Sequence, residues 1–343
     1  MPDKIGVAII GATGLAGTGH LAGYGAVPVA EVRVIWDRDP DRARVLAQEH
    51  GVPRVAETLE EAWGREEVGI VSLCTPDHLH ADHAIAALAA GKHVLCEKPM
   101  CTTVEDARRM VEAVRRSGKK LMVGMCYRFI PLSRAIHTAY RRGDIGEVFL
   151  ADGNYRSSLG QLKEKTPWRF DPKHPQDILL GGTCHAFDML RWVMDVTVEE
   201  VHGFSNHLSE PLYSIDDCYS IHCRFSNGAI GRLCAMSGAR AHTPDSSGVS
   251  LWGTKGTIWD GRLYANSRHD PVDLREQALP LSYPVTSSFG LPWGDELAHF
   301  VQCVREDRPP MIDVLHGAQS VAALCAGIES ARTGKPVRPV QEF

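Results

Sequence analysis

Apolar runs alternate with helical stretches over the first 120 residues of the chain. Five runs have the length and composition of buried strands: Lys4 to Ile10, Glu31 to Trp36, Gly69 to Cys74, His93 to Cys96 and Lys120 to Val123. The helical stretches between them often end at a glycine, which is a typical helix stop. Alternation of this kind predicts an α/β domain with a doubly wound parallel sheet.

The pattern changes after Gly146, where short runs of alternating polarity predict a second, α+β domain with an open, mainly antiparallel sheet. Asn227-Gly228 is a hairpin signal between two of the strands. The predicted strands are Val148 to Tyr155, Glu200 to Ser205, Cys218 to Phe225, Ala229 to Met236, Val249 to Gly253 and Gly256 to Trp259. Helices are expected at Gly182 to Met194, Trp293 to Glu306 and Leu315 to Thr333. We expect domains at 1–125 and 126–343, with the last helices packing partly on the first domain.

A glycine-rich loop follows the first predicted strand. The spacing Gly-x-Gly-x-x-Gly marks the dinucleotide site of a Rossmann fold. Here Gly11 fits the first position, whereas Thr13 and Ala16 replace the other two glycines. The N–H groups around Gly14 and Leu15, at the start of a helix, can still hold a pyrophosphate. A plain strand–turn–helix is the alternative.

Residues after the second and third strands strengthen the dinucleotide interpretation. Asp37 ends the second strand, where an acidic side chain binds the ribose hydroxyls of NAD. Arg38 can accommodate a 2′-phosphate, so NAD is favoured and NADP stays open. Thr75 and Pro76 end the third strand and are expected beneath the nicotinamide ribose, with His80 at the start of the next helix.

The fourth strand runs directly into Glu97-Lys98-Pro99. Open parallel sheets bind ligands outside the carboxyl ends of their strands, so Glu97 and Lys98 are expected at the cofactor. A lysine there can be partly desolvated and reach the pKa range useful for proton transfer. An exposed lysine in a turn is the alternative.

Composition narrows the function classes. A net charge of −5 gives no broad basic face, so nucleic acid is not an expected partner. No apolar run approaches the roughly 20 residues of a membrane helix. The ten cysteines contain no Cys-x-x-Cys pair, and the histidines between 77 and 83 lack neighbouring Cys or Glu ligands, so no metal is expected. Apolar surroundings of several cysteines and a strand starting at Ile5 lead us to expect a cytoplasmic protein.

Several motifs occur in an order that is similar to one known family. They are Thr75-Pro76, the segment Gly91 to Pro99, Tyr127-Arg128-Phe129, Gly143 to Val148, Trp168-Arg169, His185 to Trp192 and Glu329 to Val337. Over nearly its full length the chain resembles the glucose–fructose oxidoreductase/inositol dehydrogenase (Gfo/Idh/MocA) family. The resemblance implies a Rossmann domain, NAD(P), a sugar or polyol substrate, and a homodimer or homotetramer formed through the open sheet.

The resemblance also implies roles for individual residues. Lys98 would contact cofactor and substrate, often beside a cis proline bond, and His185 would be the acid/base partner. The family carries an Asp four residues before that histidine, but here the position is Gly181. Tyr127, and Trp168 and Arg169 in the long polar loop 156–180, are the further substrate-binding candidates.

These observations favour an NAD(P)-dependent oxidoreductase that transfers hydride between nicotinamide and a secondary alcohol or ketone carbon of a sugar, inositol or related polyol. The missing Asp keeps two alternatives open: a non-redox or regulatory sugar-binding protein, and an NAD-assisted glycoside-cleaving enzyme. Semialdehyde dehydrogenases need an activated cysteine, and short-chain reductases need a Tyr-x-x-x-Lys pair; neither is evident.

Overall fold

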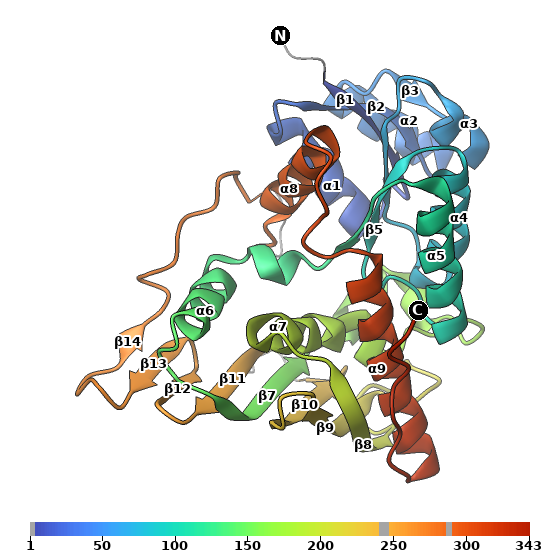
Figure 1. Cartoon of the computed structure of the whole chain (residues 1–343). Coiled ribbons are helices and arrows are strands. Elements are labelled where there is room, and N and C mark those ends of the chain that lie inside the picture. The colour runs from blue at the N-terminus through green and yellow to red at the C-terminus, as the bar shows by residue number, and fades with distance from the viewer. Residues whose placement is uncertain (1–3, 240–246, 286–289) are drawn as a thin grey trace. The chain divides into compact units, whose positions relative to one another are not determined.

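The computed structural model describes residues 4–239, 247–285 and 290–343. Its residues group into two compact units. Figure 1 shows the chain coloured from blue at the N-terminus to red at the C-terminus. The first unit contains residues 1–129, 281–318 and 343, and the second contains residues 130–280 and 319–342. The late segment 281–318 therefore belongs with the first 129 residues.

The first unit is built on a six-stranded sheet in the order β3-β2-β1-β4-β5-β6, in which every pair is parallel. Val7 to Ile10 are completely buried, as expected for a sheet covered on both faces. The strands are β1 (Ile5–Ile10), β2 (Ala30–Trp36), β3 (Arg54–Val55), β4 (Ile70–Leu73), β5 (His93–Glu97) and β6 (Leu121–Gly124). The predicted doubly wound sheet is confirmed. Strand order reverses between β1 and β4, so the loops after them lie at the switch point where such sheets bind ligands.

Helices cover both sides of this sheet. Figure 1 shows α1 with α8 on one side and α4 with α5 on the other. The helices are α1 (Leu15–Ala26), α2 (Pro40–His50), α3 (Leu59–Gly64), α4 (His80–Ala89), α5 (Val104–Ser117) and α8 (Trp293–Arg305). Single 3₁₀ turns at Asp77–Leu79 and Cys126–Phe129 follow β4 and β6.

The second unit contains an eight-stranded sheet in the order β14-β13-β12-β11-β7-β10-β9-β8. Only the β7–β10 pair is parallel among the described strands, which confirms a mainly antiparallel sheet. Gly228, at φ +85°, forms the predicted turn between β9 and β10. The strands are β7 (Val148–Arg156), β8 (Val198–Asn206), β9 (Cys218–Phe225), β10 (Ile230–Met236), β11 (Ser247–Gly253), β12 (Gly256–Trp259), β13 (Arg262–Ala265) and β14 (Val272–Asp273).

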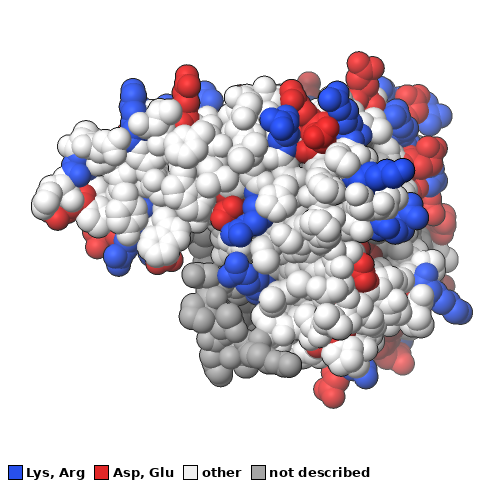
Figure 2. Space-filling view, turned by 90° about the horizontal axis from the view of Figure 1, so that it is seen from below, with Lys and Arg blue, Asp and Glu red and all other residues white. Residues whose placement is uncertain are grey.

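The two faces of this sheet differ. On one face α7 (Cys184–Met194) packs on β7 and β11, and α6 (Pro131–Arg141) packs on α7. On the other face Phe204, Ile230, Trp259 and Tyr264 are 38–69% exposed. Figure 2, seen from below, shows wide uncharged areas that are interrupted by Lys, Arg, Asp and Glu side chains. The remaining long helix is α9 (Val314–Thr333).

Candidate active site

The glycine loop after β1 brings main-chain atoms unusually close together. A Cβ on Gly11, at φ +83°, would lie 2.7 Å from the Cys74 carbonyl oxygen, and a Cβ on Gly17 would lie 2.1 Å from the Gly11 oxygen. Gly17 therefore provides the close packing that the third glycine of the usual motif provides. Helix α1 has Gly14 at its N-cap and no side chain that caps it. Its first N–H groups are available to an anion such as a pyrophosphate.

Asp37 lies beside this loop, at the end of β2. Its carboxylate accepts hydrogen bonds from the N–H groups of Thr13 (2.9 Å) and Asp39 (3.0 Å), which fix its position. A fixed carboxylate next to a nucleotide-binding loop suits ribose hydroxyls. Arg38 is exposed and makes no ion pair with any described residue. The geometry thus holds Asp37 in place and leaves the Arg38 guanidinium accessible.

His80 joins the loops that follow β4 and β5. Its imidazole is 1% exposed, and its two ring nitrogens lie 2.8 Å from the Thr75 carbonyl oxygen and 2.7 Å from that of Pro99. Both ring nitrogens are therefore engaged with main chain. His80 would therefore affect a bound cofactor indirectly, by holding the loops that contain Thr75, Pro76 and Pro99 in position.

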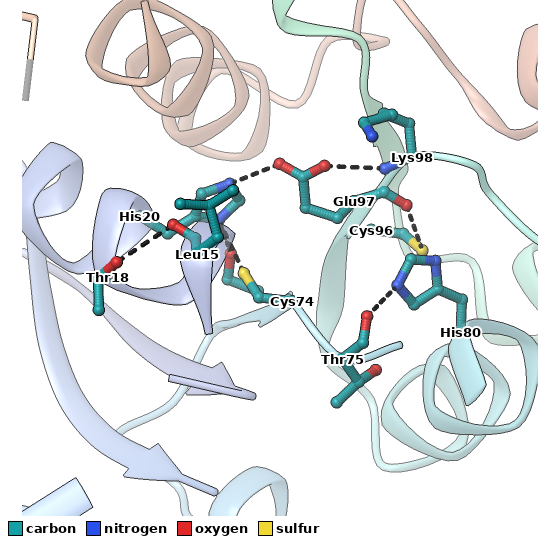
Figure 3. A network of polar contacts seen from close by, with 10 residues as sticks. Leu15, Thr18, His20, Cys74, Thr75, His80, Cys96, Glu97 and Lys98 are labelled. Carbon is teal, nitrogen blue, oxygen red and sulfur yellow. Dashed lines mark hydrogen bonds and ion pairs between the residues drawn. The ribbon is translucent and has the colours of Figure 1, made fainter. Parts of the chain in front are cut away.

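Glu97 and Lys98 end β5 and form part of the polar network in Figure 3. The Lys98–Pro99 peptide bond is cis, as the family resemblance implied. One oxygen of the Glu97 carboxylate accepts the Lys98 N–H at 3.0 Å, and the other lies 3.1 Å from His20 Nε2. The buried carboxylate thus anchors the backbone that carries Lys98.

His20 is a residue that sequence reasoning missed. It is completely buried in α1, and its Nδ1 lies 2.8 Å from Ser72 Oγ and 3.3 Å from Cys74 Sγ. The available signal was one histidine in a helix of otherwise small and apolar residues after the glycine loop. Burial raises the pKa of the Cys74 thiol well above its usual value, so this cysteine is not an activated nucleophile.

The remaining candidates are distributed over both units. Tyr127 is half-buried in the 3₁₀ turn after β6, in the first unit. Trp168 and Arg169 are half-buried in a 3₁₀ turn (Pro167–Phe170) of the second unit, with the guanidinium carbon 4.8 Å from the indole centroid. His185 is 4% exposed on α7, also in the second unit. The structure brings the cofactor-loop candidates together within the first unit, whereas the pairing of Lys98 with His185 stays a prediction.

Gly181 lies in a π-helical turn (Leu179–Thr183) that leads directly into α7. A Cβ at this position would lie 2.3 Å from the amide carbon of Gln176. Asp177, four residues before Gly181, has one carboxylate oxygen that accepts the Leu179 N–H (2.8 Å) and another that accepts the Tyr219 hydroxyl (2.7 Å). The place expected for a side chain at 181 is filled by the Gln176 amide.

Comparisons with known proteins identify the family. A family model described as an oxidoreductase family with an NAD-binding Rossmann fold matches residues 5–125, and the Gfo/Idh/MocA C-terminal domain model matches residues 133–259. The chain is 34% identical to 4-carboxy-2-hydroxymuconate-6-semialdehyde dehydrogenase of Sphingobium sp. over 314 residues, which cover 89% of this chain and 91% of that protein. The chain belongs to the Gfo/Idh/MocA oxidoreductase family.

Other members of the Gfo/Idh/MocA family are also similar to the chain. The 1,5-anhydro-D-fructose reductase of Ensifer adhaerens is 29% identical over 311 residues, 89% of this chain and 90% of that protein. A crystal structure of an Agrobacterium radiobacter oxidoreductase in complex with NAD⁺, L-tartaric acid and magnesium superposes with a TM-score of 0.87. It covers 98% of each chain at 19% identity, which shows a shared fold.

The first unit fits the cofactor of the Gfo/Idh/MocA family. Its uncapped α1 N-terminus, the close approach at Gly11 and the fixed Asp37 carboxylate are the features that an NAD-binding Rossmann domain requires. Within the described ranges, no three His, Cys, Asp or Glu side chains gather in a way that would hold a metal ion. None of the helices in the described part of the chain has the length and apolar character needed to cross a bilayer.

Proposed function

We propose that this Gfo/Idh/MocA member is an NAD-dependent dehydrogenase that interconverts a secondary alcohol and a ketone on a sugar, inositol or related polyol. The observation that carries the proposal is the anchored turn Glu97–Lys98 at the carboxyl edge of the same sheet that holds the nucleotide loop. A cation at this edge can contact both cofactor and substrate. The 1,5-anhydro-D-fructose reductase among the relatives supports a sugar-like substrate.

The proposed cofactor site consists of loop residues at the carboxyl edge of the first sheet. They are Gly11, Thr13, Gly14, Leu15, Asp37, Arg38, Thr75, Pro76, His80, Glu97 and Lys98. Glu97 and His80 would act indirectly, by holding the loops, since their polar atoms contact protein. We favour NAD because the Asp37 carboxylate would repel a 2′-phosphate, and Arg38 is the feature that would permit NADP.

Lys98 and His185 are the proposed catalytic pair. When bound, NAD supplies a hydride acceptor for the carbinol carbon. The Lys98 ammonium would hold the reacting hydroxyl and lower the cost of removing its proton, and the His185 imidazole would accept that proton. Tyr127, Trp168 and Arg169 would bind the remainder of the substrate. With no carboxylate at Gly181, this pair carries the proton transfer without the aspartate that the family resemblance implied.

A non-redox role, or NAD-assisted glycoside cleavage, is the second candidate, and Gly181 is the observation that favours it. A panel of sugars, inositols and polyols with NAD and with NADP separates the two candidates through NADH absorbance at 340 nm. Net NADH formation with a polyol supports the dehydrogenase. Clear NAD binding with no net NADH from any polyol contradicts it, and release of an aglycone from a chromogenic glycoside would identify cleavage.

We also propose that the chain forms a homodimer or homotetramer through the open face of the eight-stranded sheet. That face carries the exposed apolar side chains Phe204, Ile230, Trp259 and Tyr264 on neighbouring or nearby strands. Exposed apolar surface of this kind marks association sites. Light scattering should show a dimer or tetramer for the wild type and a smaller species for Phe204→Asp; an unchanged mass for that variant contradicts the proposed face.

A further inference from the structure

Arg169 carries a positive charge that no described carboxylate neutralises. Its Nε donates to Thr166 Oγ1 (3.2 Å) and its Nη1 donates to Gln176 Oε1, and both acceptors are neutral. Among the described residues it forms no ion pair, although it is half-buried against Trp168. A partly desolvated guanidinium without a counter-charge is unfavourable in the free protein, and a bound anion would relieve that cost.

The acidic side chains nearest to Arg169 in sequence do not pair with it. Asp171 is exposed and accepts the Lys173 N–H at 2.9 Å, and Asp177 contacts other groups. One Asp177 oxygen accepts the Leu179 N–H and the other accepts the Tyr219 hydroxyl at 2.7 Å. Burial, followed by the Asp177 charge, raises the pKa of the Tyr219 phenol, so this hydroxyl stays protonated and keeps donating to the carboxylate. Asp177 is thus paired with Tyr219 and not with Arg169.

Gln176 connects Arg169 to the predicted catalytic histidine. Its buried side-chain amide fills the space at Gly181, and its main-chain N–H donates to the Arg169 carbonyl oxygen at 3.0 Å. Gly181 precedes His185 by four residues, in a π-helical turn that leads directly into α7. At position 181, where the family resemblance implies an aspartate, the space is thus filled by the neutral Gln176 amide, which accepts a hydrogen bond from the Arg169 guanidinium.

From this arrangement we propose that Arg169, oriented by Thr166 and Gln176, binds a carboxylate of the substrate, so that the preferred substrates are carboxylated sugars or polyols such as uronates and aldonates. Arginine has five N–H donors, and two of them contact Thr166 and Gln176. The other three meet no acceptor in the described chain and can form the two-point contact that guanidinium makes with a carboxylate. This inference deepens the proposed dehydrogenase function and uses the same site.

A phosphorylated substrate is the competing source of negative charge. A phosphate has a higher charge and three acceptor oxygens, and its sites usually combine several cations or main-chain N–H groups. One guanidinium of fixed orientation is better matched to a single carboxylate. Glucose 6-phosphate therefore serves as the competing ligand in the test.

Calorimetric binding to the full-length protein loaded with NAD tests the proposal without relying on turnover. Matched pairs differ only by a carboxylate: D-glucuronate and D-glucose, D-galacturonate and D-galactose, D-gluconate and D-glucitol. We expect at least one acid to bind tenfold or more tightly than its neutral partner. Arg169→Met should weaken that acid about 10- to 100-fold, the range of one hydrogen-bonded charge contact. Arg169→Lys should recover part of the loss.

The control is Lys173→Met, which removes an exposed positive charge from the same loop and should leave the preference for the acid intact. In kinetics with the preferred acid, Arg169→Met should raise KM more than it lowers kcat. Circular dichroism verifies the fold of each variant; should Arg169→Met fail to fold, the same comparison is made with Arg169→Lys, which must still weaken the acid selectively.

The results separate the inference from the proposed function. Equal binding of acids and their neutral partners, equal weakening of both by the Arg169 substitutions, or tighter binding of glucose 6-phosphate than of glucuronate overturns the carboxylate site. Arg169-dependent binding of an acid without NADH formation from any alcohol supports the carboxylate site and overturns the dehydrogenase. NADH formation that favours neutral polyols leaves the dehydrogenase in place and overturns the inference.

Discussion

Replacing His20 should destabilise the first unit and reduce catalysis, although this side chain is completely buried. His20→Leu is similar in size but removes the contacts to Ser72 Oγ (2.8 Å), Glu97 Oε1 (3.1 Å) and Cys74 Sγ (3.3 Å). The Glu97 carboxylate, 7% exposed, would lose its side-chain partner within this network. Since that carboxylate accepts the Lys98 N–H, the turn that carries Lys98 would lose its anchor.

The size of the effect follows from the burial of both partners. Removing a buried hydrogen bond to a charged group costs about 1.5–3 kcal/mol. For a unit of roughly 150–250 residues, each kcal/mol lowers Tm by about 2–4 °C, so the expected loss is roughly 3–12 °C. Thermal and urea unfolding of wild type, His20→Leu, Glu97→Gln and the double variant form a double-mutant cycle. We expect a coupling free energy of at least about 1 kcal/mol between the two positions.

The reasoning has two points at which it can fail. If the two single substitutions are additive to within about 0.5 kcal/mol, His20 and Glu97 do not stabilise each other. If His20→Leu folds with lower stability but keeps the wild-type kcat, the network is structural and does not position Lys98. A matched control is Tyr24→Phe in the same helix, which removes one buried hydroxyl and leaves the His20–Glu97 contact in place.

Three further predictions concern the first unit. Asp37→Asn keeps an acceptor oxygen but removes the charge, so the NADP-to-NAD ratio of kcat/KM should rise about tenfold with Arg38 present; an unchanged ratio would show that Asp37 does not select the cofactor. Gly17→Ala should weaken NAD binding and lower stability because its Cβ clashes with the loop backbone, whereas Gly25→Ala, with open space around it, should gain about 0.5–1 kcal/mol in urea unfolding. Burial and nearby lysine charges lower the pKa of His93 to about 4, so the unfolded chain binds the extra proton first and stability falls as pH drops from about 6.5 to 4. For this half-buried ring we expect about 1–2 kcal/mol, measured as the difference in urea unfolding between wild type and His93→Gln at each pH; parallel profiles would contradict it.

Local signals in the sequence were sufficient for most of the fold. Helix α5 (Val104–Ser117), for example, begins where Thr103 caps it and ends where Gly118 takes up a left-handed conformation, and both signals are local. Very short elements contain too few residues for a recognisable repeat, so β3 (Arg54–Val55) and α3 (Leu59–Gly64) were missed. The parallel pairing of β7 with β10 depends on contacts distant in sequence, which periodicity does not report.

Site residues could be predicted where a local motif determines their position, and less well where tertiary packing determines it. The Gly11 loop, Asp37 and Glu97-Lys98 could be placed at the strand ends from their positions alone. The partner of Glu97, His20, is 77 residues away, and no local pattern links the two. Likewise, the sequence showed that Gly181 lacks a carboxylate, but only the structure shows the Gln176 amide in that space.

The central claim is that Lys98 serves an NAD-dependent dehydrogenase, and the most direct test is NADH absorbance at 340 nm for wild type and Lys98→Met across the sugar and polyol panel. The proposed mechanism predicts turnover by the wild type with at least one substrate. It also predicts a loss of about 10²–10⁴ in kcat for Lys98→Met while NAD binding is retained. Full turnover by Lys98→Met, or no NADH from the wild type with any substrate, would contradict it.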